Sequence, residues 1–285
     1  MKYTLSRRAF LRRSGLLGTA LGAARLPHFD LLIADPDAMP TLARAFGLTA
    51  VYRQPTFSSA VEGHLAPDSV HAISAAGRWY RMEHGFIPRE AMQPIRAYTP
   101  PLIESHSAAP FWATLIAPIS AARAWCGVQA PITVTWGYGA VTSVLGTLTD
   151  DYGLVWYESA VGWFDARHWQ RLHWSSSVDS ASLSVAVDPL RRHLIVSGTD
   201  GHWRTPYYGG NAIRQPIRAD VQTEKPGDPS GIGWWLRLSS GDKLHGAWDH
   251  NRFGMSGGGE SVEIAPAAAE RLYRQSLAAG NVPDR

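Results

Sequence analysis

The chain of 285 residues is long enough to bury the cores of two or three domains. Its formal charge is +3, but residues 1–24 hold five of the 27 basic residues and none of the 24 acidic ones, so the remainder carries −2. That balance gives no sign of a nucleic-acid partner, and no later run is apolar enough for a transmembrane segment. The single cysteine, Cys126, excludes an intramolecular disulfide and is expected to be a small buried hydrophobic residue.

The N-terminus has the layout of an export signal. "SRRAFLRRSG" at 6–15 places paired arginines before an apolar run that ends on small residues. We expect residues 1–26 to be a twin-arginine signal peptide and the mature protein to reach the periplasm, cell wall or extracellular space. The alternative is an ordinary basic and apolar first helix. Residues 27–45 are expected to form a linker or a short helix.

Two segments of short β-like runs end in the same way. "WYRMEHGFIPREAMQPI" at 79–95 and "WYESAVGWFDARHWQRL" at 156–172 share a Trp-Tyr opening and a glycine six residues after the tryptophan. Upstream, 50–61 aligns loosely with 123–134, and the second copy carries extra residues near "TDDYG".

This repeated pattern resembles the bacterial SH3-like family. The resemblance predicts one module over 46–98 and another over 110–174, joined by a linker at 99–109. Trp79 and Trp156, which recur in the repeat, are expected in the cores. A single divergent β-sandwich built from both halves is the alternative.

Residues 178–285 are predicted to form a third unit. "SLSVAVDPLRRHLIVSG" at 182–198 alternates apolar and polar residues around an Asp-Pro-Leu turn, which indicates a hairpin. "GIGWWLRLSSGDKLHG" at 231–246 indicates a second strand pair, and 265–280 a terminal helix that stops at Gly280. The intervening segment is rich in turn residues, and no strand is assigned to it.

Several motifs of this third unit resemble, in order, the YkuD-type L,D-transpeptidase family. They are the 182–198 hairpin, Thr205-Pro206, "LHGAWDHNRFG" at 244–254 and "SVEIAPAAAERLY" at 261–273. The resulting fold class is mainly β, with two SH3-like small barrels followed by a β-rich L,D-transpeptidase-like domain with a C-terminal helix.

The resemblance implies a site in which the family's cysteine nucleophile is replaced by Ser261. His245 would be the base, with Gly246 on the strand edge facing the substrate, while Gly259 stands at the family's second histidine. A serine depends more strongly than a thiol on a general base. The expected substrate-binding residues are His250, Asn251, Gly258, Gly259 and Trp234. A shifted alignment would place Ser256 at the nucleophile position.

Three functions follow as hypotheses. The first is an exported, catalytically degenerate protein that binds peptidoglycan stem peptides or glycan, since Glu260 and Glu263 beside Ser261 oppose a developing oxyanion. The second is an active serine acyltransferase or hydrolase, and the third a structural envelope protein. No cofactor is implied. The histidines, including His193 and His202, lack metal-ligand spacing. Trp136, Trp203 and Trp235 are left open between glycan stacking and core packing.

Overall fold

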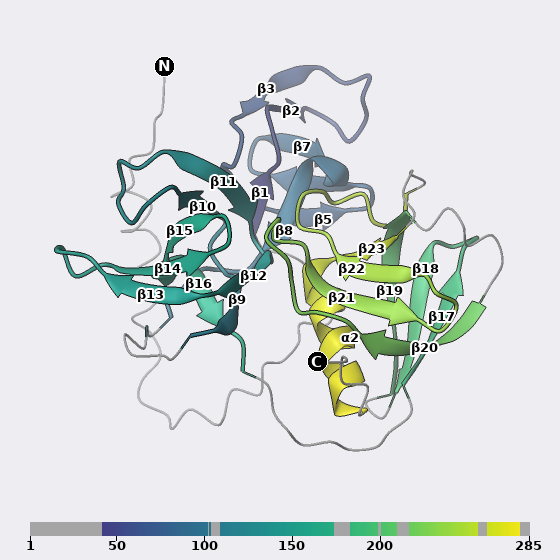
Figure 1. Cartoon of the computed structure of the whole chain (residues 1–285). Coiled ribbons are helices and arrows are strands. Elements are labelled where there is room, and N and C mark those ends of the chain that lie inside the picture. The colour runs from purple at the N-terminus through teal and green to yellow at the C-terminus, as the bar shows by residue number, and fades with distance from the viewer. Residues whose placement is uncertain are drawn as a thin grey trace, which may run out of the picture. The chain divides into compact units, whose positions relative to one another are not determined.

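The computed structural model describes residues 42–101, 103, 109–173, 183–198, 201–209, 217–255 and 261–279. The chain separates into residues 1–35 and 36–285, and all described residues belong to the second unit. They form a mainly β protein with one C-terminal α-helix, as predicted (Figure 1). Within the described ranges, no helix is long and apolar enough to cross a membrane.

The first β-unit consists of two small sheets. Its elements are β1 (Leu42–Ala45), β2 (Thr49–Tyr52), β3 (Val61–Leu65), β4 (Val70–Ala72), β5 (Ser74–Ala76), β6 (Trp79–Met82), β7 (Gly85–Pro88), the 3-10 helix η1 (Arg89–Ala91) and β8 (Met92–Ile95). The sheets have the orders β4-β1-β8 and β3-β2-β7-β6-β5. Tyr80 and Ile87 are fully buried between them.

The second β-unit repeats this architecture. Its elements are β9 (Phe111–Leu115), β10 (Ile119–Arg123), β11 (Ile132–Gly137), β12 (Val141–Val144), β13 (Gly146–Thr149), β14 (Val155–Ser159), β15 (Gly162–Asp165), η2 (Ala166–His168) and β16 (Trp169–Arg171). The sheets run β12-β9-β16 and β11-β10-β15-β14-β13. Trp136 packs edge-to-face on Phe164 and Trp169 in the core.

The strand pairings establish which residues of the two units are equivalent. Trp79 pairs with Pro88 and Trp156 with Asp165, so the predicted match of the two endings is reproduced. Upstream, Tyr52 pairs with Phe86 and Arg123 with Trp163, which shifts the expected alignment by two residues. The predicted longer hairpin loop lies between β13 and β14.

The third unit is a closed barrel of seven strands in the order β17-β18-β19-β23-β22-β21-β20. The strands are β17 (Ser184–Asp188), β18 (His193–Gly198), β19 (Gly201–Gly209), β20 (Ile217–Thr223), β21 (Gly233–Leu238), β22 (Lys243–Gly246) and β23 (Val262–Ile264). Helix α2 (Pro266–Ala278) contacts β20, β21 and β22 (Figure 1). Apolar side chains from the strands and α2 form one core.

Both predicted hairpins of this unit and the terminal helix are present. Pro266 opens the helix at a position where a missing backbone N–H costs little. The predicted stop, Gly280, lies outside the described residues.

Three other features differ from expectation. Strand β1 starts at Leu42, inside the segment expected to be a linker. Cys126 is half-buried in the exposed loop after β10, where Trp125 is 56% exposed, so it is not the core residue that its apolar neighbour suggested. The turn-rich middle segment contains β19 and β20, and Pro206 stands where β19 leaves β18 and begins to pair with β23.

Candidate functional site

The candidate site lies on β22 and β23, the one parallel pair among the strand pairs described. His245 is in register with Glu263, and Ser261 immediately precedes β23. Leu244 and Val262 are fully buried and fix the register of the two strands. The parallel pairing therefore brings together residues sixteen positions apart.

Polar contacts connect four side chains across these strands. The Nε2 atom of His245 lies 3.0 Å from Ser261 Oγ and 4.0 Å from Glu263 Oε1. The other carboxylate oxygen of Glu263, Oε2, lies 2.6 Å from His250 Nε2. Ser261, His245, Glu263 and His250 therefore form a continuous polar row.

His245 is 5% exposed, and burial lowers its pKa below the ordinary value of 6.5. The Glu263 carboxylate is the main influence in the opposite direction, followed by the backbone of Gly246 and the charges of Asp249 and Asp228. The Nδ1 atom is buried and makes no hydrogen bond among the described residues. Burial therefore favours the neutral ring, and Nε2 is the ring nitrogen that has a hydrogen-bond partner among the described residues.

The surroundings of His250 determine which of its nitrogens carries the proton. The backbone N–H of Arg252 donates to Nδ1 at 3.2 Å, so Nδ1 is the acceptor. The proton of the neutral ring is then on Nε2 and is donated to Glu263. The rings of Tyr208 and Phe253 lie 4.8 and 5.2 Å from the His250 ring. His250 is thus a fixed donor to Glu263.

The two adjacent tryptophans of β21 have different environments. Trp234 was expected to contact substrate, but it is 1% exposed and packs against Tyr273 in the core. Its φ of +63° accompanies a bulge between Gly233 and Leu236. Trp235 instead lies beside His245, with ring centroids 4.4 Å apart. The bulge interrupts regular strand alternation at this pair, so the sequence held no reliable signal for which tryptophan faces the site.

The other predicted site residues serve structural contacts. A Cβ atom on Gly246 would lie 3.0 Å from Ala269 Cβ and 3.2 Å from Pro266 Cα, so the glycine allows α2 to approach β22. The Nδ2 atom of Asn251 donates to the backbone oxygen of Arg89 at 2.9 Å. Gly258 and Gly259, as well as Ser256 and Glu260, lie outside the described residues.

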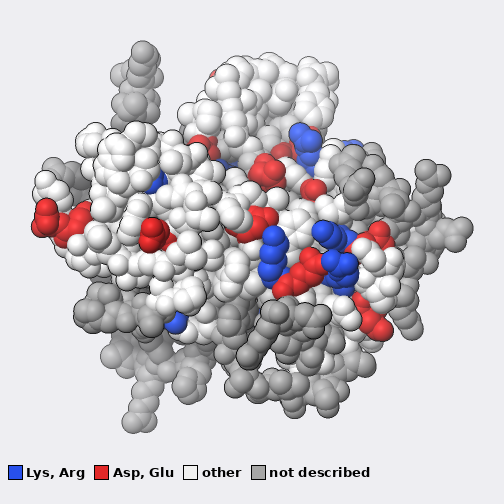
Figure 2. All heavy atoms as spheres, in the orientation of Figure 1, with Lys and Arg blue, Asp and Glu red and all other residues white. Residues whose placement is uncertain are grey.

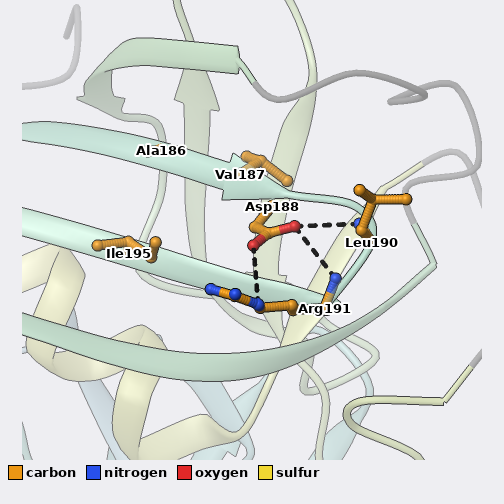
Figure 3. A pocket seen from close by; sticks show the side chains of 6 residues that line it. All are labelled: Ala186, Val187, Asp188, Leu190, Arg191 and Ile195. Carbon is orange, nitrogen blue, oxygen red and sulfur yellow. Dashed lines mark hydrogen bonds and ion pairs between the residues drawn. The ribbon is translucent and has the colours of Figure 1, made fainter.

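A separate hollow of about 380 Å³ lies on the β17–β18 hairpin (Figure 3). It is bordered by Leu190 and Ile195, and Asp188 Oδ1 accepts the backbone N–H groups of Leu190 and Arg191 at 3.1 Å. This carboxylate stabilises the predicted turn. None of the polar row borders the hollow, which is therefore distinct from the candidate site.

Acidic and basic side chains are intermixed on the face drawn in Figure 2. No group of three or more His, Cys, Asp or Glu side chains among the described residues is arranged to hold a metal ion. The polar row at β22 and β23 is therefore the arrangement on which a function can be argued.

Comparisons with known proteins give little information. No family model and no curated protein matches the chain. Among solved structures, the chain is similar to one described as "putative autolysin" from Listeria monocytogenes, with 12% identity and a TM-score of 0.21. The similarity covers 58% of this chain and 88% of that one. A similarity of this size carries no argument about fold or function.

Proposed function

We propose that this is an exported cell-envelope protein whose C-terminal barrel binds peptidoglycan stem peptides or glycan beside Ser261 and His245 without turning them over. The resemblance of 244–254 and 261–273 to the L,D-transpeptidase family supports the ligand class. The proposed lack of turnover is supported by the polar row of Ser261, His245, Glu263 and His250. Ser261 stands in place of the family's cysteine, and the Glu263 carboxylate lies 4.0 Å from His245 Nε2, where its charge favours an N–H group over the lone pair that a base must offer to Ser261.

The physical reason is that a serine hydroxyl must lose its proton while it attacks a carbonyl carbon. His245 would have to accept that proton on Nε2 with its other nitrogen, Nδ1, making no hydrogen bond to a described residue. The nearby Glu263 carboxylate would also raise the energy of an oxyanion formed at Ser261. A bound peptide can use the same polar groups without any of these charge changes.

Active serine acyl transfer is the second candidate, because Ser261 Oγ and His245 Nε2 are within hydrogen-bonding distance. In this reaction Oγ would bond to the carbonyl carbon of a donor peptide while His245 takes the hydroxyl proton. Collapse of the tetrahedral species would break the bond to the leaving amine, which takes that proton. An amine or water would then attack the acyl carbon and give a proton to His245, which returns it to Ser261 Oγ as the bond between Oγ and the acyl group breaks.

Intact-mass spectrometry and calorimetry on the purified protein separate the two candidates. The protein would be incubated with a carbapenem and, separately, with disaccharide-tetrapeptide fragments. We expect measurable fragment binding, no covalent adduct, and binding that survives Ser261→Ala. An adduct that disappears in Ser261→Ala but persists in Ser256→Ala would establish acyl transfer. Absence of both an adduct and binding would favour a structural envelope role instead.

A further inference from the structure

We propose that Glu263 holds His245 with its proton on Nε2, so that Ser261 accepts the hydrogen bond between them and is not activated as a nucleophile. This inference deepens the proposed function, because it gives a reason for the absence of turnover. It assigns Glu263 as a positioning residue that acts through His245.

The first argument comes from the two nitrogens of His245. A neutral imidazole carries its proton on one nitrogen and a lone pair on the other. The Nδ1 atom is buried without a hydrogen bond among the described residues, and a buried donor without a partner is costlier than a buried lone pair. Contact with the Gly246 backbone raises the pKa of His245, but Nδ1 makes no hydrogen bond of normal geometry to a described residue. A proton on Nε2, donated to Ser261 Oγ, avoids the unpaired donor.

The second argument is electrostatic. Glu263 Oε1 lies 4.0 Å from His245 Nε2, close enough for its negative charge to favour an N–H group there over a lone pair. Both sites are largely shielded from solvent, since the His245 and Glu263 side chains are 6% and 19% exposed. Screening by water is therefore reduced, and the two arguments select the same tautomer.

His250 makes this arrangement stable. Its Nδ1 atom accepts from Arg252, which directs its Nε2–H to Glu263 Oε2. The carboxylate is thus held by one oxygen and presents the other toward His245. Activation of Ser261 would require the His245 proton to move to Nδ1. That move would leave an unpaired buried N–H and a lone pair facing the Glu263 carboxylate.

Long-range proton–nitrogen NMR on the ¹⁵N-labelled full chain tests the inference directly, because the two nitrogen shifts of a histidine report its tautomer. Signals would be assigned to His245 by their loss in His245→Gln. At neutral pH without ligand we expect the proton on Nε2. In Glu263→Gln the charge is removed and the side-chain amide can donate to Nε2, so the two shifts should converge or exchange order.

The matched control is Glu270→Gln, which removes a glutamate that pairs with Arg274 on α2, outside the polar row. This variant should leave the His245 shifts unchanged. A proton on Nδ1 in the unaltered protein would overturn the inference, even if Glu263→Gln did not fold. Unchanged shifts in folded Glu263→Gln would also overturn it. Fragment binding is measured separately, so a failure of the proposed ligand class would leave the tautomer result standing.

Discussion

Burial of His245 makes the stability of the C-terminal barrel depend on pH. Because burial lowers its pKa below 6.5, the unfolded chain binds this proton more tightly than the folded protein does. The contribution of neutral His245 is therefore complete above about pH 6.5 and is lost as the pH falls toward the folded-state pKa. We expect urea denaturation to show a smaller loss of stability from pH 7.5 to 5.5 in His245→Gln than in the unaltered protein.

The comparison uses the change with pH rather than absolute stability, because His245→Gln also alters packing. His71 provides an internal control. Burial lowers the pKa of His71 too, but this residue belongs to the first β-unit. It lies on β4 and pairs with Ala43 of β1. His71→Gln should therefore flatten the pH dependence of that unit and leave the barrel's unchanged. Equal pH slopes for the barrel with and without His245 would show that its protonation is not coupled to folding.

At the residue scale, sequence reasoning identified the segments of the site better than the direction of each side chain. His245, Ser261 and Glu263 were singled out from the family resemblance, and the structure places them in contact or within 4.0 Å. The facing of Trp234 and Trp235 depends on a bulge that interrupts strand alternation. The His250–Glu263 contact joins β23 to the loop after β22, which no local pattern encodes.

At the element scale, the equivalent glycines Gly85 and Gly162 open β7 and β15 at φ of +145° and +131°. A Cβ atom on Gly162 would lie 2.3 Å from the backbone oxygen of Arg123. Because neither the backbone angle nor the contact tolerates a side chain, we expect Gly162→Ala to destabilise the second β-unit by about 2 kcal/mol or more. Equilibrium denaturation followed by tryptophan fluorescence measures this effect.

Gly153 offers a matched control in the same unit. Its φ is +75°, but a Cβ atom there would meet nothing within 4 Å. Gly153→Ala should therefore lower the free energy of unfolding by about 1 kcal/mol, which is the cost of holding an alanine in the left-handed backbone conformation. A loss in Gly162→Ala no larger than that in Gly153→Ala would show that the close approach to Arg123 is relieved by a small shift of the chain.

The elements themselves could be predicted where residue pattern and turn chemistry agreed. The repeated endings share a tryptophan, a tyrosine and a glycine at fixed spacing, and their strands pair in the same register. Upstream, the corresponding strands share almost no residue types, so the alignment expected from the sequence was wrong by two residues. The β19 strand was missed because Pro206 interrupts a run that changes its pairing partner at that point.

At the scale of the whole molecule, the mainly β fold followed from short β-like runs separated by turn residues, whereas the positions of the aromatic side chains did not. The sequence left two alternatives for Trp136, which were stacking on a ligand and packing in a core. Trp136 is fully buried, as are Trp169 and Trp234 to within 1%. Small β-units of this size need large side chains to fill their cores, which explains why so many of the tryptophans are internal. Composition alone does not distinguish this use from a surface platform.

The proposed export of the protein rests on the paired arginines near its N-terminus. The sequence places Arg7-Arg8 before Phe10 and Leu11, and a second pair, Arg12-Arg13, follows. We expect Arg7→Lys with Arg8→Lys to keep the protein in the cytoplasm. Lysine preserves the positive charge but not the guanidinium groups read by a receptor for the paired-arginine motif. Cell fractionation followed by immunoblotting measures the distribution.

The second arginine pair supplies the control for this experiment. Arg12→Lys with Arg13→Lys makes the same chemical change at the same net charge, five residues further along, and should leave export intact. If both double variants are exported equally well, the paired arginines contribute only charge, and residues 1–26 do not act as a twin-arginine signal. If only the Arg7→Lys, Arg8→Lys variant stays in the cytoplasm, the first arginine pair directs export, and the chain beyond residue 26, with 21 basic and 24 acidic residues, carries a formal charge of −3.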